Sequence, residues 1–134
     1  MWHSLQLKVI LCCCLIMGSY EISLADDMFI ATSSTFRLNK KTIQSFVKEA
    51  KAGSAEAAFK LYQHYDFVDL DQRNGEKWLK MAAGYNHPIA QYNLAARYLM
   101  QKRLKDAMTW ALKAKENKHS KADRLIEEIK QKMK

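Results

Sequence analysis

The sequence predicts an all-α protein: a short right-handed α-solenoid of antiparallel helix pairs, with about six helices, behind an N-terminal signal peptide. Three observations predict this class. The 134 residues include one proline and four glycines, too few turn-forming residues for a fold of many short strands. Apolar residues make up 49% and charged residues 27%, a globular balance that excludes wholesale disorder. Apolar positions also recur with a period of about 33 residues, which is typical of helical repeats.

The N-terminal segment is expected to be a signal peptide that is removed from the folded chain. Lys8 is followed by ten uncharged residues, 9–18, which are too few to span a bilayer but suit the apolar region of a secretory signal. Ser23 and Ala25 are small residues of the kind that a signal peptidase reads. The chain would then begin at Asp26 and be exported, to the periplasm or out of the cell. A buried N-terminal helix is the alternative.

An internal repeat organises the rest of the chain. Within each unit, apolar residues recur at every fourth position, which gives one stripe along an α-helix. Each unit is therefore a first-type and a second-type helix, which run antiparallel and stack on the next pair to gain a core. Trp78 and Trp110 are expected to be buried in that core. Five columns keep the register: Ala57, Ala90 and Ala122; Leu61, Leu94 and Ile126; Tyr65 and Tyr98; Phe46, Trp78 and Trp110; and Ala50, Ala82 and Ala114.

The register and the helix-breaking residues predict where the helices begin and end. Gly53, Gly84 and Asn86 are expected at joints, where a left-handed backbone is favourable for glycine and tolerable for asparagine. Ser54 and Ser120 can cap the following helices, and Pro88 suits a first turn. The expected second-type helices span 40–52, 72–84 and 103–117, and the first-type helices span 54–66, 87–100 and 120–133. The expected organisation is a signal peptide (1–25), an extended lead-in (26–39) and a helical repeat domain (40–134).

Four stretches carry a family resemblance: Gly53-(x3)-Ala57-(x3)-Leu61-(x3)-Tyr65; Trp78-(x3)-Ala82-Ala83; Ala90-Gln91-Tyr92-Asn93-Leu94-Ala95-(x2)-Tyr98; and Ala107-(x2)-Trp110-Ala111-Leu112-Lys113-Ala114. Over about residues 43–131 the chain resembles the Sel-one-like repeat family, close relatives of tetratricopeptide repeats. It departs from that pattern in a shorter loop between paired helices that lacks Gly-x-Gly. Gly75 also replaces the alanine that matches Ala107, and Asn86 and Lys118 stand where glycine is usual.

The resemblance implies a module that binds another protein and catalyses no reaction. We expect the protein to be a monomer. Family members serve as adaptors in signalling, secretion and host interaction, and some exported bacterial members look like immunity proteins against secreted toxins. We therefore expect an exported bacterial envelope adaptor or a toxin-neutralising immunity protein. The alternative is a peptidoglycan-binding module or a weak hydrolase of the envelope. The β-lactam binding of a cysteine-rich branch is not carried over, because all cysteines here lie in the expected signal peptide.

The residue pattern favours neither an enzyme nor a cofactor or metal site. His87 and His119 lie one repeat apart and stacked repeats could bring them together, but a zinc site needs three or four ligands. Asp66, Asp69 and Asp71 are interpreted as a solvated turn, since the glycine and the distant glutamate of a calcium loop are missing. The chain shows neither a Ser-His-Asp order nor a glycine-rich phosphate loop.

Positive charge is concentrated at the C-terminal end. The formal charge of the chain is +8, and residues 101–134 hold eleven lysines and arginines against five acidic residues. An acidic protein partner, anionic lipid or cell-wall polymer, and a merely solubilising face are all consistent with this surplus. Nucleic acid is not expected as a partner, because stacking aromatic residues are not interleaved with these charges.

The candidate partner-binding surface is the groove lined by the first-type helices. Phe59 and Tyr92 lie one repeat apart, so they occupy equivalent points on successive units and are candidate apolar anchors. The alternative is that both belong to the core. If the groove is not the site, the convex face with Lys113 and Lys115 is the next candidate. The predicted binding residues are Phe59, Gln63, Asp66, Tyr92, Ala96, Leu99 and Arg124.

Overall fold

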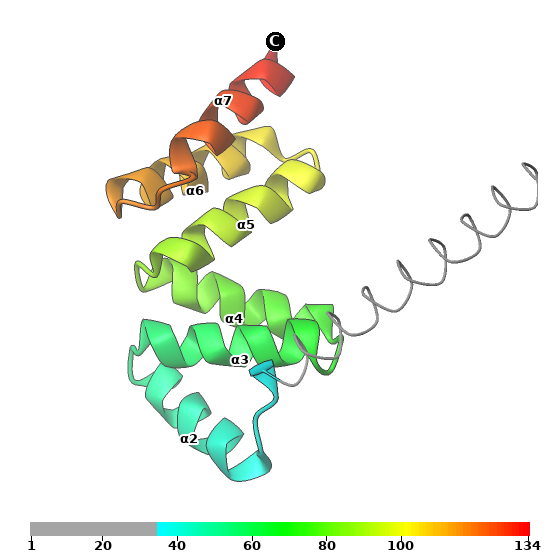
Figure 1. The fold of residues 1–134 in the computed structure, drawn as a ribbon, viewed down its shortest axis with the longest axis vertical. Coiled ribbons are helices and arrows are strands. Elements are labelled where there is room, and N and C mark those ends of the chain that lie inside the picture. Colours follow the sequence, from blue (N-terminus) through cyan, green and yellow to red (C-terminus); the bar gives the residue numbers. More distant parts are fainter. Residues whose placement is uncertain (1–34) are drawn as a thin grey trace, which may run out of the picture. The chain divides into compact units, whose positions relative to one another are not determined.

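The computed structural model describes residues 35–134; the expected signal peptide (1–25) and lead-in residues 26–34 lie outside the described residues. Residues 40–134 form six helices and residues 35–134 contain no strand, so the predicted all-α class is confirmed (Figure 1). Residues 35 and 36, expected to be extended, are helical, whereas residues 37–39 form no helix. The helices are α2 (Lys40–Lys51), α3 (Ala55–Phe67), α4 (Gln72–Gly84), α5 (Pro88–Met100), α6 (Leu104–Glu116) and α7 (Ala122–Met133).

Each helix begins and ends within two residues of its predicted limits, because the capping residues act locally. Pro88 is the first residue of α5, as predicted. The prediction that Ser120 caps the last helix is wrong, because α7 begins two residues later and has no side-chain cap. The N-terminal backbone N–H groups of α2 to α5 donate to the side chains of Asn39, Ser54, Asp71 and His87.

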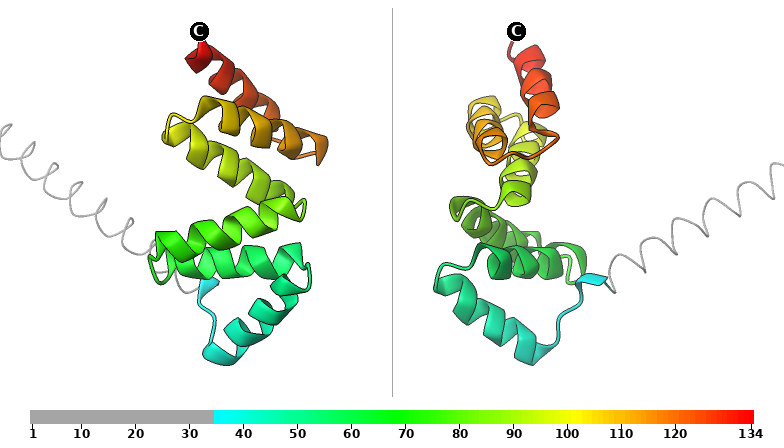
Figure 2. Two further views of the ribbon diagram at one scale, coloured as in Figure 1. Left: turned by 180° about the vertical axis from the view of Figure 1, so that it is seen from behind. Right: turned by 60° about the vertical axis from the view of Figure 1, so that its left-hand side comes forward.

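The helices pack mainly against their neighbours in sequence. The most extensive contacts join α3 with α4 and α5 with α6, which makes two helical hairpins. The two hairpins contact each other through α4 and α5, while α2 packs on α3 and α7 packs on α6 and α5. Figure 2 shows this succession from two further directions, with α2 and α7 at the ends and the hairpins between them.

The apolar columns of the repeat form the core. Every alanine and leucine of the columns is buried, and so is Ile126 in α7. Trp78 is buried as predicted, whereas Trp110 is only partly buried. The two tryptophans lie on helices with different neighbours. Trp78 is on α4, which packs between α3 and α5, and both of these belong to hairpins. Trp110 is on α6, which packs against α5 and against α7, a helix without a partner of its own.

The joints between helices repeat in their backbone conformation as well. Gly53, Asn86 and Lys118, which follow one another at the repeat interval, have φ values of 104°, 63° and 61°. Leu70 and Lys102, also one repeat apart, take φ values of 54° and 59° in the turns within the two hairpins. The residue that follows each of Gly53, Asn86 and Lys118 donates its backbone N–H to the carbonyl five residues earlier, which is a Schellman-type helix end. These hydrogen bonds join Ser54 to Glu49, His87 to Ala82 and His119 to Ala114.

Candidate interaction groove

An open groove of about 850 Å³ lies where α3, α5 and the start of α4 meet. Tyr62 and Phe67 of α3 line it, together with Arg73 from α4 and Arg97 and Met100 from α5. The groove thus joins two successive first-type helices. Its lining mixes apolar side chains and two arginines with Glu76 and the amides of Gln72, Asn93 and Gln101. Aromatic residues, methionine and arginine are enriched on surfaces that bind proteins.

Arg97, which lines this groove from α5, forms an ion pair with Asp66 of α3. An Nη atom of Arg97 donates to both carboxylate oxygens of Asp66, at 2.9 and 2.8 Å. The side chains are only 21% and 11% exposed, so water screens the pair weakly. Burial by itself lowers the pKa of Arg97, but the hydrogen bonds and charge of Asp66 outweigh it and the net direction is upward. Burial, followed by the Asp66 charge, raises the pKa of the neighbouring Tyr62.

The same carboxylate explains the glycine that departs from the repeat pattern. A Cβ atom at Gly75 would lie 2.6 Å from Oδ1 of Asp66 and 3.0 Å from its Cβ. Arg97 holds Asp66 in this position, so an alanine like Ala107 of the next unit would displace the ion pair. Gly75 is therefore a packing requirement of the Asp66–Arg97 pair.

Two of the predicted binding residues are buried, so the expectation that they lie open in the groove is wrong. Phe59 is 7% exposed because the ring of His87, at the start of the next first-type helix, stacks on it at 4.2 Å between centroids. Leu99 is 9% exposed and packs in the core. Tyr92 remains partly exposed, although His119 stacks on it at 4.4 Å.

The other predicted binding residues differ in their exposure and in the groups that they contact. Ala96 lines the groove, whereas the carboxylate of Asp66 is engaged by α5 within the protein. Gln63 is partly buried, and its Oε1 atom is buried without a hydrogen-bond partner among the described residues. Arg124 is exposed on α7. Of the seven predicted residues, Ala96 lines this groove and Asp66 binds its lining residue Arg97, whereas the other five do not line it.

The histidines at the joints were missed as structural elements. The ring of His87 stacks on Phe59, and the ring of His119 stacks on Tyr92. The two histidines lie one repeat apart, as do the two aromatic residues, and this spacing is the signal from which the sequence could have predicted the stacking. Nε2 of His87 also lies 3.2 Å from Oε2 of Glu56. Within residues 35–134, no group of three or more histidine, cysteine or acidic side chains is arranged to hold a metal ion.

The three acidic residues after α3 have separate roles. Asp66 pairs with α5, and Oδ2 of Asp69 lies 3.5 Å from Nε2 of His64. Asp71 caps α4 by accepting from the backbone N–H of Asn74 at 3.1 Å. The hydrogen bonds from Asn74 lower the pKa of the Asp71 carboxyl. The interpretation of all three as one solvated turn is therefore wrong for Asp66, which reaches the next repeat.

We expect an NMR titration to give His119 a pKa below its ordinary value of 6.5, because burial and then the charge of Lys121 disfavour the imidazolium. Tyr92→Ala uncovers one face of the ring and should raise this pKa. The matched control Tyr85→Ala removes an exposed tyrosine and should leave it unchanged. Since the unfolded chain binds this proton more readily than the native state, the stability tied to His119 is complete above pH 6.5 and is lost as the pH falls below it. A parent pKa at or above 6.5 would contradict this account.

A second groove continues along the C-terminal side of α5. It has a volume of about 490 Å³ and lies between α5, the start of α6 and the end of α7. Met100 lines both grooves, so they meet at that side chain. The six lining residues are Leu99, Met100, Lys102, Leu104, Glu128 and Lys132.

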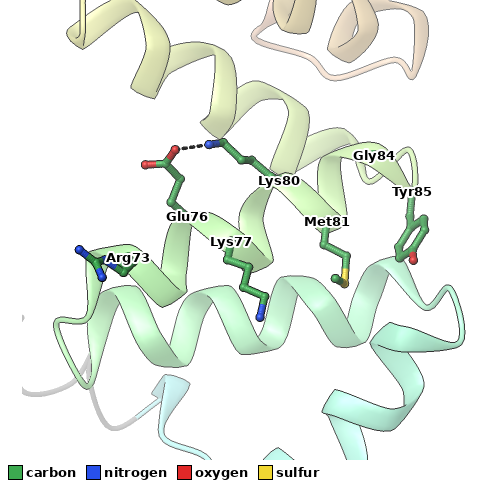
Figure 3. Close-up of a pocket in the computed structure, with 7 residues that line it drawn as sticks. All are labelled: Arg73, Glu76, Lys77, Lys80, Met81, Gly84 and Tyr85. Carbon is green, nitrogen blue, oxygen red and sulfur yellow. Dashed lines mark ion pairs between the residues drawn. The ribbon is translucent and has the colours of Figure 1, made fainter.

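A shallower hollow of about 750 Å³ follows α4 (Figure 3). Lys77 and Met81 point to one side of the helix, and Glu76 and Lys80 point to the other, where they form an ion pair at 2.5 Å. Tyr85, at the end of α4, is 41% exposed. Because this hollow is lined almost wholly by one helix, it offers no junction between repeats.

Comparisons of this chain with protein-family models, with curated proteins and with solved structures find no match. Among residues 35–134, no helix is both long and apolar enough to cross a bilayer. What can be inferred of function therefore comes from the repeat geometry and from the two connected grooves.

Proposed function

We propose that the described helices form a short right-handed α-solenoid of the Sel-one-like kind and that this protein is a non-catalytic module that binds a protein partner. The observation that carries the proposal is the repetition of the same joint. Left-handed residues recur at positions 53, 86 and 118, with the same backbone hydrogen bond after each. Stacked helix pairs of this kind build extended surfaces suited to protein recognition.

The groove chemistry favours a protein ligand over a sugar. Two open grooves share the exposed side chain of Met100, and their charged groups are mostly cationic. A site for a cell-wall sugar needs convergent polar groups that are free to bind it. Here Arg97, the least exposed cation of the groove lining, is already bound to Asp66.

The charge of the surface supports an acidic partner. In residues 101–134, ion pairs join Arg103 with Asp106, Lys115 with Asp123 and Lys130 with Glu127. The remaining basic residues of this segment outnumber the remaining acidic ones by eight to two, because three of the eleven cations and three of the five acids are paired. We further propose that the chain is exported and acts as an envelope adaptor or as an immunity protein that neutralises a secreted toxin.

The proposal is tested by finding the partner and measuring the complex with purified components. The tagged protein is incubated with envelope extract, and each captured protein is purified and titrated against it by calorimetry. We expect saturable binding to one protein and none to isolated cell-wall sacculi in a sedimentation assay. Saturable binding to sacculi, with no protein that binds in the titration, would overturn the proposed function.

A further inference from the structure

One repeat position is exposed and apolar in every first-type helix. Phe67, Met100 and Met133 are the last residues of α3, α5 and α7, and they follow one another at the repeat interval. They are 38%, 84% and 50% exposed, whereas the alanines and leucines of the other columns are buried. We call these three side chains the apolar ladder. Exposed large apolar groups that recur in one register indicate a surface which another molecule covers.

Two of the three ladder residues, Phe67 and Met100, line the grooves. Phe67 and Met100 both line the larger groove, and Met100 also lines the smaller one. Lys132, next to Met133 in sequence, closes the smaller groove at α7. Figure 1 shows the C-terminal ends of α3 and α5 on the same side of the stack. A single elongated segment that follows both grooves can therefore contact Phe67 and Met100 and reach Lys132 at the end of α7, next to Met133.

Cations flank the ladder without acidic partners of their own. Three exposed cations line the grooves: Arg73, Lys102 and Lys132. None of them takes part in an ion pair formed within residues 35–134. Two acidic residues line the grooves, Glu76 and Glu128. Glu76 is paired with Lys80, so Glu128 is the one acidic lining residue that enters none of the ion pairs within residues 35–134. The rim of the ladder is therefore cationic, and its charge complements an acidic ligand.

We propose that the apolar ladder is the docking surface for an amphipathic helical segment of the partner protein, with an apolar face on Phe67, Met100 and Met133 and acidic flanks on the cationic rim. This rests on the proposed function. Methionine is unbranched and adaptable, and it is frequent on surfaces that bind amphipathic helices. An apolar stripe in a groove, bordered by charge, is the arrangement that such a helix requires.

The test uses a synthetic helical peptide of about 18 residues, roughly 27 Å long, with leucines on one face and glutamates on its flanks. Its matched control has lysine in place of every glutamate. The full chain carries ¹³C-labelled methionine methyl groups and is titrated with each peptide by NMR. We expect the acidic peptide to shift the signals of Met100 and Met133 and to leave Met81 and Met108 unchanged, while the lysine peptide does not bind.

Variants locate the contact. Met100 is mostly exposed, so Met100→Ser preserves the fold and should weaken binding of the acidic peptide about tenfold or more. Ile89→Ser removes an apolar group at the other end of α5, which is also exposed, and should change the affinity less than about twofold. Lys102→Glu should weaken binding most at low salt.

Several results would overturn the proposal: no binding of the acidic peptide, equal binding of both peptides, shifts at Met81 instead of Met100, or parental affinity in Met100→Ser. Binding to phosphatidylglycerol vesicles that Met100→Ser abolishes, with no peptide binding, would assign the ladder to a membrane and would also overturn it. If Met100→Ser binds the captured protein partner with parental affinity, the ladder is not the site and the proposed function stands. If no protein partner exists, both fail.

Discussion

Replacing Trp78 with alanine is expected to lower the free energy of unfolding by about 3–5 kcal/mol, the range for deleting a large buried aromatic side chain. Trp78 is 6% exposed on α4, which contacts both α3 and α5. Its removal leaves a cavity in the core. In a small stack, where each pair is stabilised mainly by its neighbours, this loss can exceed the total stability. Urea denaturation followed by far-ultraviolet circular dichroism measures it.

Trp110 provides the internal comparison, because it occupies the same column one repeat later and is only partly buried. Trp110→Ala should cost about half as much as Trp78→Ala, in proportion to the smaller apolar area removed from water. Tyr85→Ala, at an exposed aromatic residue, should change the stability by less than about 0.5 kcal/mol. A Trp78→Ala variant as stable as the parent would show that the packing register is wrong.

The second large effect is expected at the ion pair between neighbouring repeats. Arg97→Ala should lower the free energy of unfolding by about 3 kcal/mol, at the low end of the range for breaking a buried pair. The variant leaves the Asp66 carboxylate, 11% exposed, without its partner in a poorly hydrated position. The cost arises from this stranded charge and not only from the lost attraction. Urea denaturation at neutral pH measures it.

A double-mutant cycle separates the two contributions. If the stranded charge dominates, Asp66→Ala together with Arg97→Ala should be more stable than Arg97→Ala alone. Lys80→Ala is the matched control, because it breaks an exposed surface pair with Glu76 within α4, and it should cost less than about 1 kcal/mol. Losses that simply add in the double variant would contradict direct coupling of α3 and α5 through this pair.

The two effects together describe how neighbouring units are joined. Trp78 supplies apolar burial on α4, which contacts helices of both hairpins, while Asp66 and Arg97 join successive first-type helices by charge. Gly75 allows the second contact by leaving room for the carboxylate. A stack held in this way depends on nearest-neighbour interfaces, which is the physical basis expected for repeat proteins.

The sequence by itself determined the helices and the buried columns. Helix limits depend on short-range signals such as the serine at position 54 and the proline at position 88, so they could be predicted to within two residues. The columns of alanine and leucine were predicted because the period of the α-helix and the longer period of the repeat identify the same face in every unit. The all-α class followed from these two local patterns.

Only the tertiary structure decided which repeated side chains remain exposed. Periodicity places Phe59 and Tyr92 at equivalent positions, but whether they are covered depends on His87 and His119, which reach them from the next first-type helix. The Asp66 carboxylate, part of an apparent surface turn in the sequence, is likewise bound by Arg97 of the next repeat.

The apolar ladder was hidden for the same reason. Phe67, Met100 and Met133 follow the repeat as faithfully as the core columns do, so their spacing alone cannot distinguish them from core residues. Their exposure arises because each is the last residue of its helix, beyond the stripe that meets the neighbouring helices. Local periodicity thus specifies which residues are equivalent, whereas the long-range packing of successive helices determines which of them are left for a partner.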